Sequence, residues 1–207
     1  MSNKSSQIIS NQLTSAIMAG GKSRRFGTPK TNALLWNRKL VDYAIKIAKL
    51  MSDNVLVVTG EKKICFDDES ITVKDIFPGM GPLGGIYTAL LKSPTPYVAT
   101  LPCDMPFLTP EIFKFLFSCL DGTRPVVAVS QSGVEPMIAI WHKSALDTIF
   151  KNIERKKLSI YATLEHLDVV KVVIKDKVLN DQNDVFTNIN YKQDLENILQ
   201  LYYQKTE

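Results

Sequence analysis

Two glycines and four cations directly follow a short apolar run near the start of the chain. Gly20 and Gly21 carry no side chain, so the backbone there can turn at positive φ and bring its N–H groups close to a bulky anion. Arginine adds a planar fork for phosphate oxygens and lysine a mobile positive charge. The cations are Lys22, Arg24, Arg25 and Lys30. This combination favours a bound polyphosphate over a single carboxylate, with a solvated basic loop as the alternative.

A single carboxylate follows a second apolar run. Residues 98–106 read Val-Ala-Thr-Leu-Pro-Cys-Asp-Met-Pro, so Asp104 stands between Pro102 and Pro106. A carboxylate and a polyphosphate repel each other unless a cation joins them, and Mg²⁺ bridges carboxylate and phosphate oxygens in this way. Asp104 is therefore a candidate Mg²⁺ ligand. The alternative is a residue that forms a turn or caps the next helix.

A glycine-rich segment at 75–85 reads Asp-Ile-Phe-Pro-Gly-Met-Gly-Pro-Leu-Gly-Gly. Its small residues allow close backbone approach, so the segment could wrap a base or ribose. From Gly79 it also reads Gly-x-Gly-x-x-Gly, and Asp104 lies about twenty residues further on, as in the dinucleotide-binding fingerprint. Because Pro82 interrupts that motif, a nicotinamide-dependent Rossmann enzyme is the minor alternative.

Two amides stand at alternate positions near the end of the chain. Asn188 and Asn190 share one face of an extended segment before a predicted helix at 191–199. Each amide offers donors and an acceptor, so the pair could hydrogen-bond a heterocycle. Alternatively, Asn190 simply caps the helix.

Composition narrows the class of protein. The 207 residues fit one domain, and 45% hydrophobic with 22% charged residues is typical of soluble globular chains. The net charge of +4 is mild and its cations are dispersed, so we expect no nucleic-acid or membrane partner. The start of the chain lacks the apolar core of a signal peptide, and no apolar run reaches the ~20 residues of a membrane span, so we expect a cytoplasmic protein.

Cysteine and histidine are sparse. The three cysteines form no Cys-x-x-Cys pair, which indicates a reducing compartment. The two histidines, His142 and His166, have no partner at metal spacing, so we expect neither a zinc site nor a histidine-based triad.

The pattern of segments predicts what positions these residues. Apolar and β-branched runs alternate with amphipathic ones, as in a layered α/β domain with mainly parallel strands. Strands are predicted at 14–18, 54–59, 71–73, 97–101, 126–130, 136–141 and 169–174, and helices at 39–51, 85–91, 109–120, 144–153, 158–166 and 191–199. The runs at 126–141 resemble a hairpin, so the sheet should be mixed. Ligands bind beyond the carboxyl ends of such strands, where Gly20, Asp75 and Asp104 are expected.

Four of these motifs together resemble one family. Residues 18–30 read Met-Ala-Gly-Gly-Lys-Ser-Arg-Arg-Phe-Gly-Thr-Pro-Lys and resemble the molybdenum cofactor guanylyltransferase signature Leu-Ala-Gly-Gly-x-Ser-x-Arg-Met-Gly-x-Asp-Lys. The resemblance continues in order through Gly-Pro-Leu-x-Gly at 81–85, Pro-Cys-Asp-x-Pro at 102–106 and Asn-x-Asn at 188–190. Four ordered matches over most of the chain are more specific than any one of them.

The resemblance implies a three-layer, Rossmann-like nucleotide-diphospho-sugar-transferase fold with a mostly parallel, mixed sheet. We expect one domain over 13–207 after a flexible extension at 1–12. The implied reaction joins the GMP part of GTP to the terminal phosphate of molybdopterin and releases pyrophosphate. Alternatives are a cytidylyltransferase for molybdopterin or another phosphorylated small molecule, and a nucleotide-binding regulatory domain without turnover. Further expected partners are proteins that deliver or accept the cofactor.

The resemblance also implies a role for individual residues. Nucleotide binding would involve Met18, Ala19, Gly20, Gly21, Lys30, Asp75, Pro82, Leu83 and Asp104. Catalysis would involve Arg25, Lys30 and Asp104, with Mg²⁺ on Asp104, and pterin binding Asn188 and Asn190. Two departures stand out, since Pro29 replaces the acid before the signature lysine, and Val58-Thr59 stands where some relatives carry Asn. Guanine or ribose contacts at the latter position are not carried over.

Overall fold

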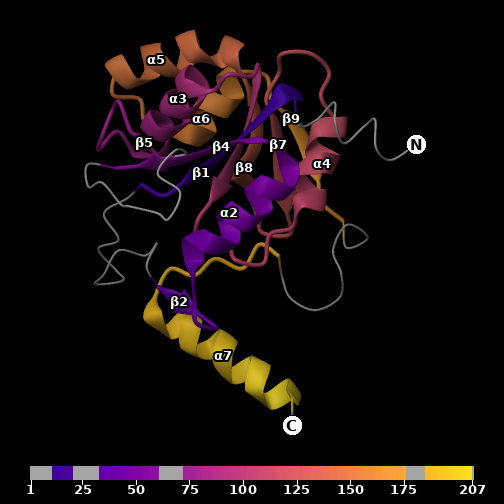
Figure 1. Ribbon diagram of the computed structural model, residues 1–207. Helices are drawn as coiled ribbons and strands as arrows, with labels where there is room; N and C mark the ends of the chain where they lie inside the picture. The colour runs from indigo at the N-terminus through magenta and orange to yellow at the C-terminus, as the bar shows by residue number, and fades with distance from the viewer. Residues whose placement is uncertain (1–10, 21–32, 61–71, 176–184, 207) are drawn as a thin grey trace.

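A seven-stranded sheet forms the centre of the molecule (Figure 1). The computed structural model describes residues 11–20, 33–60, 72–175 and 185–206, with side chains up to residue 200. The order across the sheet is β5-β4-β1-β6-β8-β7-β9. The strands are β1 (Leu13–Met18), β4 (Asn54–Thr59), β5 (Thr72–Lys74), β6 (Tyr97–Pro102), β7 (Val126–Ser130), β8 (Gly133–His142) and β9 (Val170–Val173). Only β8 pairs antiparallel with its neighbours, which confirms the mixed, mostly parallel sheet.

Helices cover both faces of the sheet, giving the expected three layers. On one face lie α2 (Leu40–Met51) and α4 (Pro110–Ser118). On the other lie α3 (Gly81–Lys92), α5 (Leu146–Glu154), after a short 3₁₀ turn at Lys143–Ala145, and α6 (Ile160–His166). The central strands are therefore buried twice: in β1, Ile17 packs under α2 while Ala16 faces α3. Burial on both faces explains why these strands read as continuous apolar runs.

A small third cluster lies beside the main body. It joins the hairpin β2 (Leu34–Leu35) and β3 (Arg38–Lys39) to α7 (Lys192–Thr206), which extends away from the sheet in Figure 1. Its buried members are Leu35, Leu40, Ile189 and Leu195. The sequence pattern did not predict this hairpin, because strands of two residues show no alternation and Trp36-Asn37 forms its positive-φ turn without glycine.

Two predicted boundaries were wrong in an informative way. Helix α3 begins at Gly81 rather than at residue 85, because Pro82 in its first turn is preorganised for a helix. The strand β8 begins at Gly133 rather than at residue 136, and its pairing with β7 shifts register between Val127 and Ala128. Such a bulge bends the hairpin where it passes the carboxyl end of β6.

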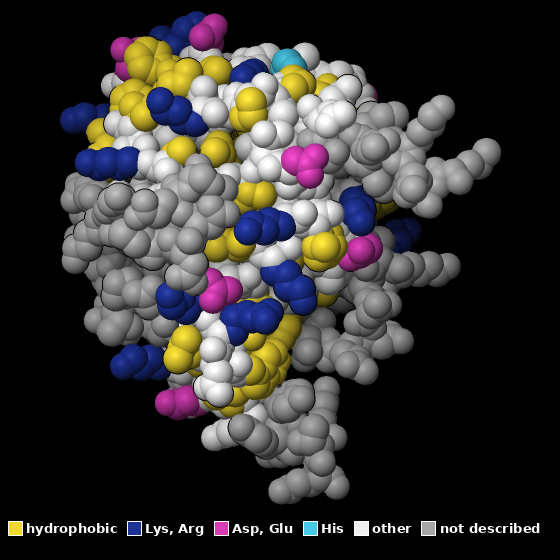
Figure 2. Space-filling view, in the orientation of Figure 1, with side chains coloured by type: hydrophobic (Ala, Val, Ile, Leu, Met, Phe, Trp, Pro, Cys, Tyr) yellow, Lys and Arg dark blue, Asp and Glu magenta, His cyan; other side chains and the backbone are white. Residues whose placement is uncertain are grey.

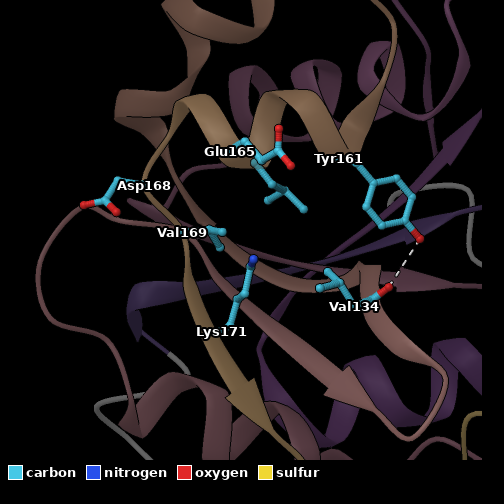
Figure 3. A pocket seen from close by; sticks show the side chains of 7 residues that line it. Val134, Tyr161, Glu165, Asp168, Val169 and Lys171 are labelled. Atoms are coloured by element: carbon cyan, nitrogen blue, oxygen red, sulfur yellow. Dashed lines mark hydrogen bonds between the residues drawn. The ribbon is translucent and has the colours of Figure 1, made fainter.

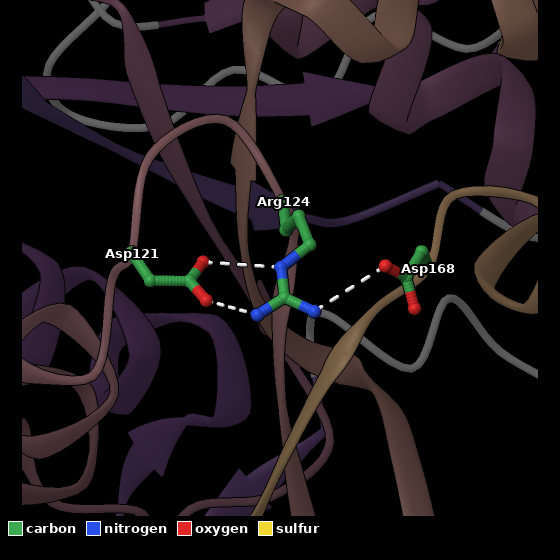
Figure 4. A network of polar contacts seen from close by, with 3 residues as sticks. All are labelled: Asp121, Arg124 and Asp168. Atoms are coloured by element: carbon green, nitrogen blue, oxygen red, sulfur yellow. Dashed lines mark hydrogen bonds and ion pairs between the residues drawn. The ribbon is translucent and has the colours of Figure 1, made fainter.

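Charged side chains are distributed over the surface. Figure 2 shows Lys and Arg along the face over α2, with Asp and Glu among them. At the amino ends of β7 and β9, Arg124 contacts both Asp121 and Asp168 (Figure 4). The hydrogen bonds from Arg124 lower the pKa of Asp121. This exposed network therefore joins two loops at the edge opposite Asp104. No helix within the described residues is long and apolar enough to cross a bilayer.

Candidate active site

Four parallel strands end in register at one edge of the sheet. Met18 of β1 pairs with Val58 of β4 on one side and Pro102 of β6 on the other, and Val58 pairs with Val73 of β5. The segments that follow these strands therefore leave the sheet side by side. They carry the predicted residues Gly20, Asp75 and Asp104, which the fold brings to one edge as the strand pattern predicts.

The end of β1 is closely packed against the end of β4. The backbone N–H of Ala19 donates to the carbonyl oxygen of Val58 at 2.9 Å, so pairing continues past Met18. A Cβ atom added to Gly20 would lie 3.4 Å from the backbone nitrogen of Gly60. The ends of β1 and β4 thus stay in van der Waals contact up to the point where the predicted phosphate loop begins.

Asp75 is held by a compact set of hydrogen bonds. Its backbone N–H donates to the carbonyl oxygen of Thr59 at 2.8 Å, extending the pairing of β5 with β4. Its Oδ1 accepts the N–H of Phe77 at 2.9 Å and lies 2.9 Å from the hydroxyl oxygen of Thr88 on α3. The carboxyl group is therefore fixed between the end of β5 and the middle of α3.

The glycine-rich segment packs as the first turns of a helix. A Cβ atom at Gly84 would stand 2.6 Å from the carbonyl oxygen of Phe77, and one at Gly85 would stand 2.4 Å from the Cε of Met18. Glycine is thus needed at 84, where α3 meets the backbone of the turn after β5, whereas at 85 the contacting atom is the end of a flexible side chain. That the segment wraps a base or ribose stays a prediction. Pro82 is exposed at the start of α3, whereas the side chain of Leu83 is fully buried. Any nucleotide contact of Leu83 is consequently limited to its backbone.

Asp104 lies in the turn after β6 and is half-buried. Its carbonyl oxygen accepts the N–H of Ile189 at 2.9 Å, and the Ile189 side chain is fully buried in the third cluster. This contact brings the exposed residues Asn188 and Asn190 to the turn that carries Asp104. Two predicted motifs far apart in the sequence therefore belong to one structural feature.

A residue that the sequence pattern did not predict organises the amide segment. The Asp194 carboxylate accepts the backbone N–H groups of Asn190 and Tyr191 at 2.7 and 2.8 Å. It sits in the first turn of α7, where an acid accepts such N–H groups as half of a capping box. The sequence signal for this role is an acid placed three residues after the first residue of the predicted helix at 191–199.

The predicted phosphate grip lies outside the described residues. This applies to Gly21, Lys22, Arg24, Arg25 and Lys30, and also to Pro29. Their roles stay predictions.

Among the residues that the structure describes, no group of three or more His, Cys, Asp or Glu could hold a metal ion. Mg²⁺ that acts on nucleotides is held by one or two carboxylates and the substrate phosphates, rather than by a cage of protein ligands. A half-buried carboxylate at a strand end fits that donor set.

A separate half-open cleft of about 320 Å³ lies between α6 and β9 (Figure 3). It is lined by Val134, Tyr161, Leu164, Glu165, Asp168, Val169 and Lys171, and none of them is a predicted site residue. The Tyr161 hydroxyl donates to the carbonyl oxygen of Val134 at 3.3 Å, a bond between two residues of its lining. The strand ends at Gly20 and Asp104 lie elsewhere, so this cleft is distinct from the candidate active site.

Comparison with known proteins assigns the chain to a family. The sequence model of the MobA-like NTP transferase domain matches residues 15–169, a range that runs from within β1 to the start of β9. The chain belongs to the MobA-like NTP transferase family. A relative from Halalkalibacterium halodurans, named probable molybdenum cofactor guanylyltransferase, is 32% identical over 190 residues, covering 86% of this chain and 93% of the relative.

Solved structures share the fold of this MobA-like chain. Molybdopterin-guanine dinucleotide biosynthesis protein A from Archaeoglobus fulgidus superposes with a TM-score of 0.76 at 24% identity, covering 92% of this chain and 99% of that one. 2-C-methyl-D-erythritol 4-phosphate cytidylyltransferase from Thermus thermophilus superposes with a TM-score of 0.66 at 14% identity, covering 92% and 98%. The MobA-like fold thus occurs in proteins named for different nucleotides. Membership of this family selects the nucleotidyltransferase interpretation over the dinucleotide-fingerprint alternative.

Proposed function

We propose that the chain transfers GMP from GTP to the terminal phosphate of molybdopterin, forming the guanine dinucleotide cofactor and pyrophosphate. The observation that carries the proposal is the contact between Ile189 and Asp104, which joins the amide segment to the acid turn at the carboxyl edge of a MobA-like sheet. The relative from Halalkalibacterium halodurans carries the name of this activity. A nucleotide site and a heterocycle site on one edge are what a transfer between them requires.

The reaction needs no general acid or general base from the protein. An anionic oxygen of the pterin phosphate attacks the α-phosphorus of GTP, and the bond from that phosphorus to the β-phosphate oxygen breaks. The bonding pair leaves with pyrophosphate. A phosphate monoester is already largely ionised near neutral pH, so its oxygen needs no deprotonation. Catalysis then rests on positioning and on neutralising charge.

Different segments of the chain bind the nucleotide, the departing pyrophosphate and the pterin. The strand ends at Met18 to Gly20 and the start of α3 hold the nucleotide through backbone groups. Arg25 and Lys30 stabilise the charge that develops on pyrophosphate, and Asn188 with Asn190 hydrogen-bond the pterin. Asp104 would hold Mg²⁺, which when bound supplies a positive charge to the phosphate oxygens.

The test is a product assay with two nucleotides. The purified chain is incubated with molybdopterin, Mg²⁺ and either GTP or CTP, and pyrophosphate and the dinucleotide product are measured. We expect product with GTP and at least about tenfold less with CTP, since one set of base contacts discriminates by that order. A preference for CTP would support the cytidylyltransferase alternative. GTP binding without pyrophosphate release would support the regulatory alternative.

A further inference from the structure

Thr88 is the one fully buried hydroxyl on α3, and it touches three groups at the candidate nucleotide site. The backbone N–H of Ile76 donates to its Oγ1 at 2.9 Å. That oxygen lies 2.9 Å from Asp75 Oδ1 and 2.9 Å from the carbonyl oxygen of Gly84. The hydroxyl therefore accepts one hydrogen bond and shares its single proton between two acceptors.

The surrounding contacts leave little freedom for this arrangement. Phe77, whose N–H also binds Asp75 Oδ1, packs its ring against Tyr87 at 5.3 Å and Phe150 at 6.1 Å between centroids. The turn after β5 is thus anchored on α3 and α5. Rotation of the Asp75 side chain would break the hydrogen bonds from both Phe77 and Thr88.

The two oxygens of Asp75 consequently have different surroundings. Oδ1 accepts the structural hydrogen bonds from Phe77 and Thr88, and both oxygens face Gly84, where an added Cβ atom would lie 3.2 Å from Oδ2 and 3.3 Å from Oδ1. Glycine leaves that side of the carboxyl group uncovered by a side chain. An ionised carboxylate only accepts hydrogen bonds, and in a nucleoside triphosphate only the ribose hydroxyls and base N–H groups donate them.

We infer that Thr88 is a positioning residue for nucleotide binding. It holds Oδ1 of Asp75 so that Oδ2 can accept a hydrogen bond from the ribose or base of the nucleotide. Thr88 itself does not touch the nucleotide. The inference rests on the proposed function, because it requires that GTP binds at this edge of the sheet.

The test measures GTP binding by calorimetry, without any acceptor, in the full chain with Mg²⁺. Thr88→Val removes the hydroxyl at nearly constant volume and should raise the Kd for GTP about tenfold, whereas Thr88→Ser should stay within about twofold. If Thr88 acts through Asp75, adding Thr88→Val to Asp75→Ala should change the Kd no further than Asp75→Ala alone.

Thr163→Val is the matched control for a purely structural effect. Thr163 is also fully buried in a helix, lies 3.0 Å from the carbonyl oxygen of Ser159 four residues earlier, and accepts an N–H from Asn152 at 3.0 Å. The Thr163→Val substitution should lower the thermal midpoint, as Thr88→Val does, and leave the Kd for GTP unchanged. An unchanged Kd in Thr88→Val, with Tm lowered, would overturn the inference. Failure of the unsubstituted chain to bind GTP would overturn the proposed function, and this inference with it.

Discussion

The backbone N–H of Ile189 donates to the carbonyl oxygen of Asp104 at 2.9 Å. This bond ties the segment before α7 to the turn after β6, and Ile189 secures it by burying its side chain completely. The amides on either side of Ile189 are exposed. A buried anchor between two exposed amides thus presents both polar side chains beside the acid turn.

Asp104→Asn should abolish GMP transfer while leaving the fold intact. The substitution keeps the size of the side chain but removes the charge that would hold Mg²⁺. We expect kcat to fall at least about a hundredfold, as for loss of a principal electrostatic group. Pyrophosphate release and the urea unfolding midpoint are measured together, and a folded variant with full activity would contradict the metal assignment.

Asp194→Ala should weaken binding of the acceptor more than binding of the nucleotide. The variant loses the carboxylate that accepts the N–H groups of Asn190 and Tyr191, a cap worth about 0.5–2 kcal/mol. We expect the KM for molybdopterin to rise severalfold while the KM for GTP stays the same. Glu196→Ala is the matched control, because Glu196 is an exposed acid on the same helix. Equal effects of the two substitutions on the KM for molybdopterin would count against this role of Asp194.

Gly84→Ala should be more destabilising than Gly85→Ala. The new Cβ at 84 meets the backbone carbonyl of Phe77, which is itself held by the N–H of Met80 at 3.2 Å. The new Cβ at 85 meets only the end of the Met18 side chain, which can rotate away. We expect Gly84→Ala to lower the free energy of unfolding by about 1–3 kcal/mol. Gly85→Ala should cost less, because the gain in helix propensity of about 1 kcal/mol applies at both positions and only Gly84 meets a backbone atom. Urea unfolding measures the free energy of unfolding of both variants. A larger loss for Gly85→Ala would show that the Phe77 carbonyl group moves away from the new Cβ atom at little cost.

His142 should make the folded state less stable as the pH falls. Burial lowers the pKa of His142 below its ordinary value of 6.5, so the unfolded chain binds this proton more tightly than the folded one. Its contribution to stability is present above pH 6.5 and is lost as the pH falls toward the folded pKa. Nδ1 of His142 accepts the N–H of Ser144 at 3.1 Å, a role that asparagine can retain without titrating. Thermal midpoints of the wild type and His142→Asn between about pH 8 and pH 5 should therefore converge as the pH falls. Parallel curves for the two proteins would exclude His142 as the cause of the loss of stability at low pH.

The sequence by itself determined the strands of the central sheet, most of the helix boundaries and the ordered motifs of this chain. Continuous apolar runs mark strands that are buried on both faces, and period-3.6 patterns mark helices that are buried on one face, so strands such as β4 and β7 lie where predicted. The Gly-Gly loop and Asp104 also carry their chemistry locally, in backbone freedom and charge. The resemblance to one family follows from their order along the chain.

Only the tertiary structure decided which of these residues meet. The parallel order of β5, β4, β1 and β6 places Gly20, Asp75 and Asp104 on one edge, and the return of the chain after β9 adds the amides. Thr88 acquires its role from partners that packing supplies, because no local pattern encodes a hydrogen bond from a helix to a strand end. The cap that Asp194 forms is local by contrast, since its partners lie three and four residues earlier in the chain. Gly84 shows the same limit: composition marks it as permissive, and close contact with the carbonyl oxygen of Phe77 makes it necessary.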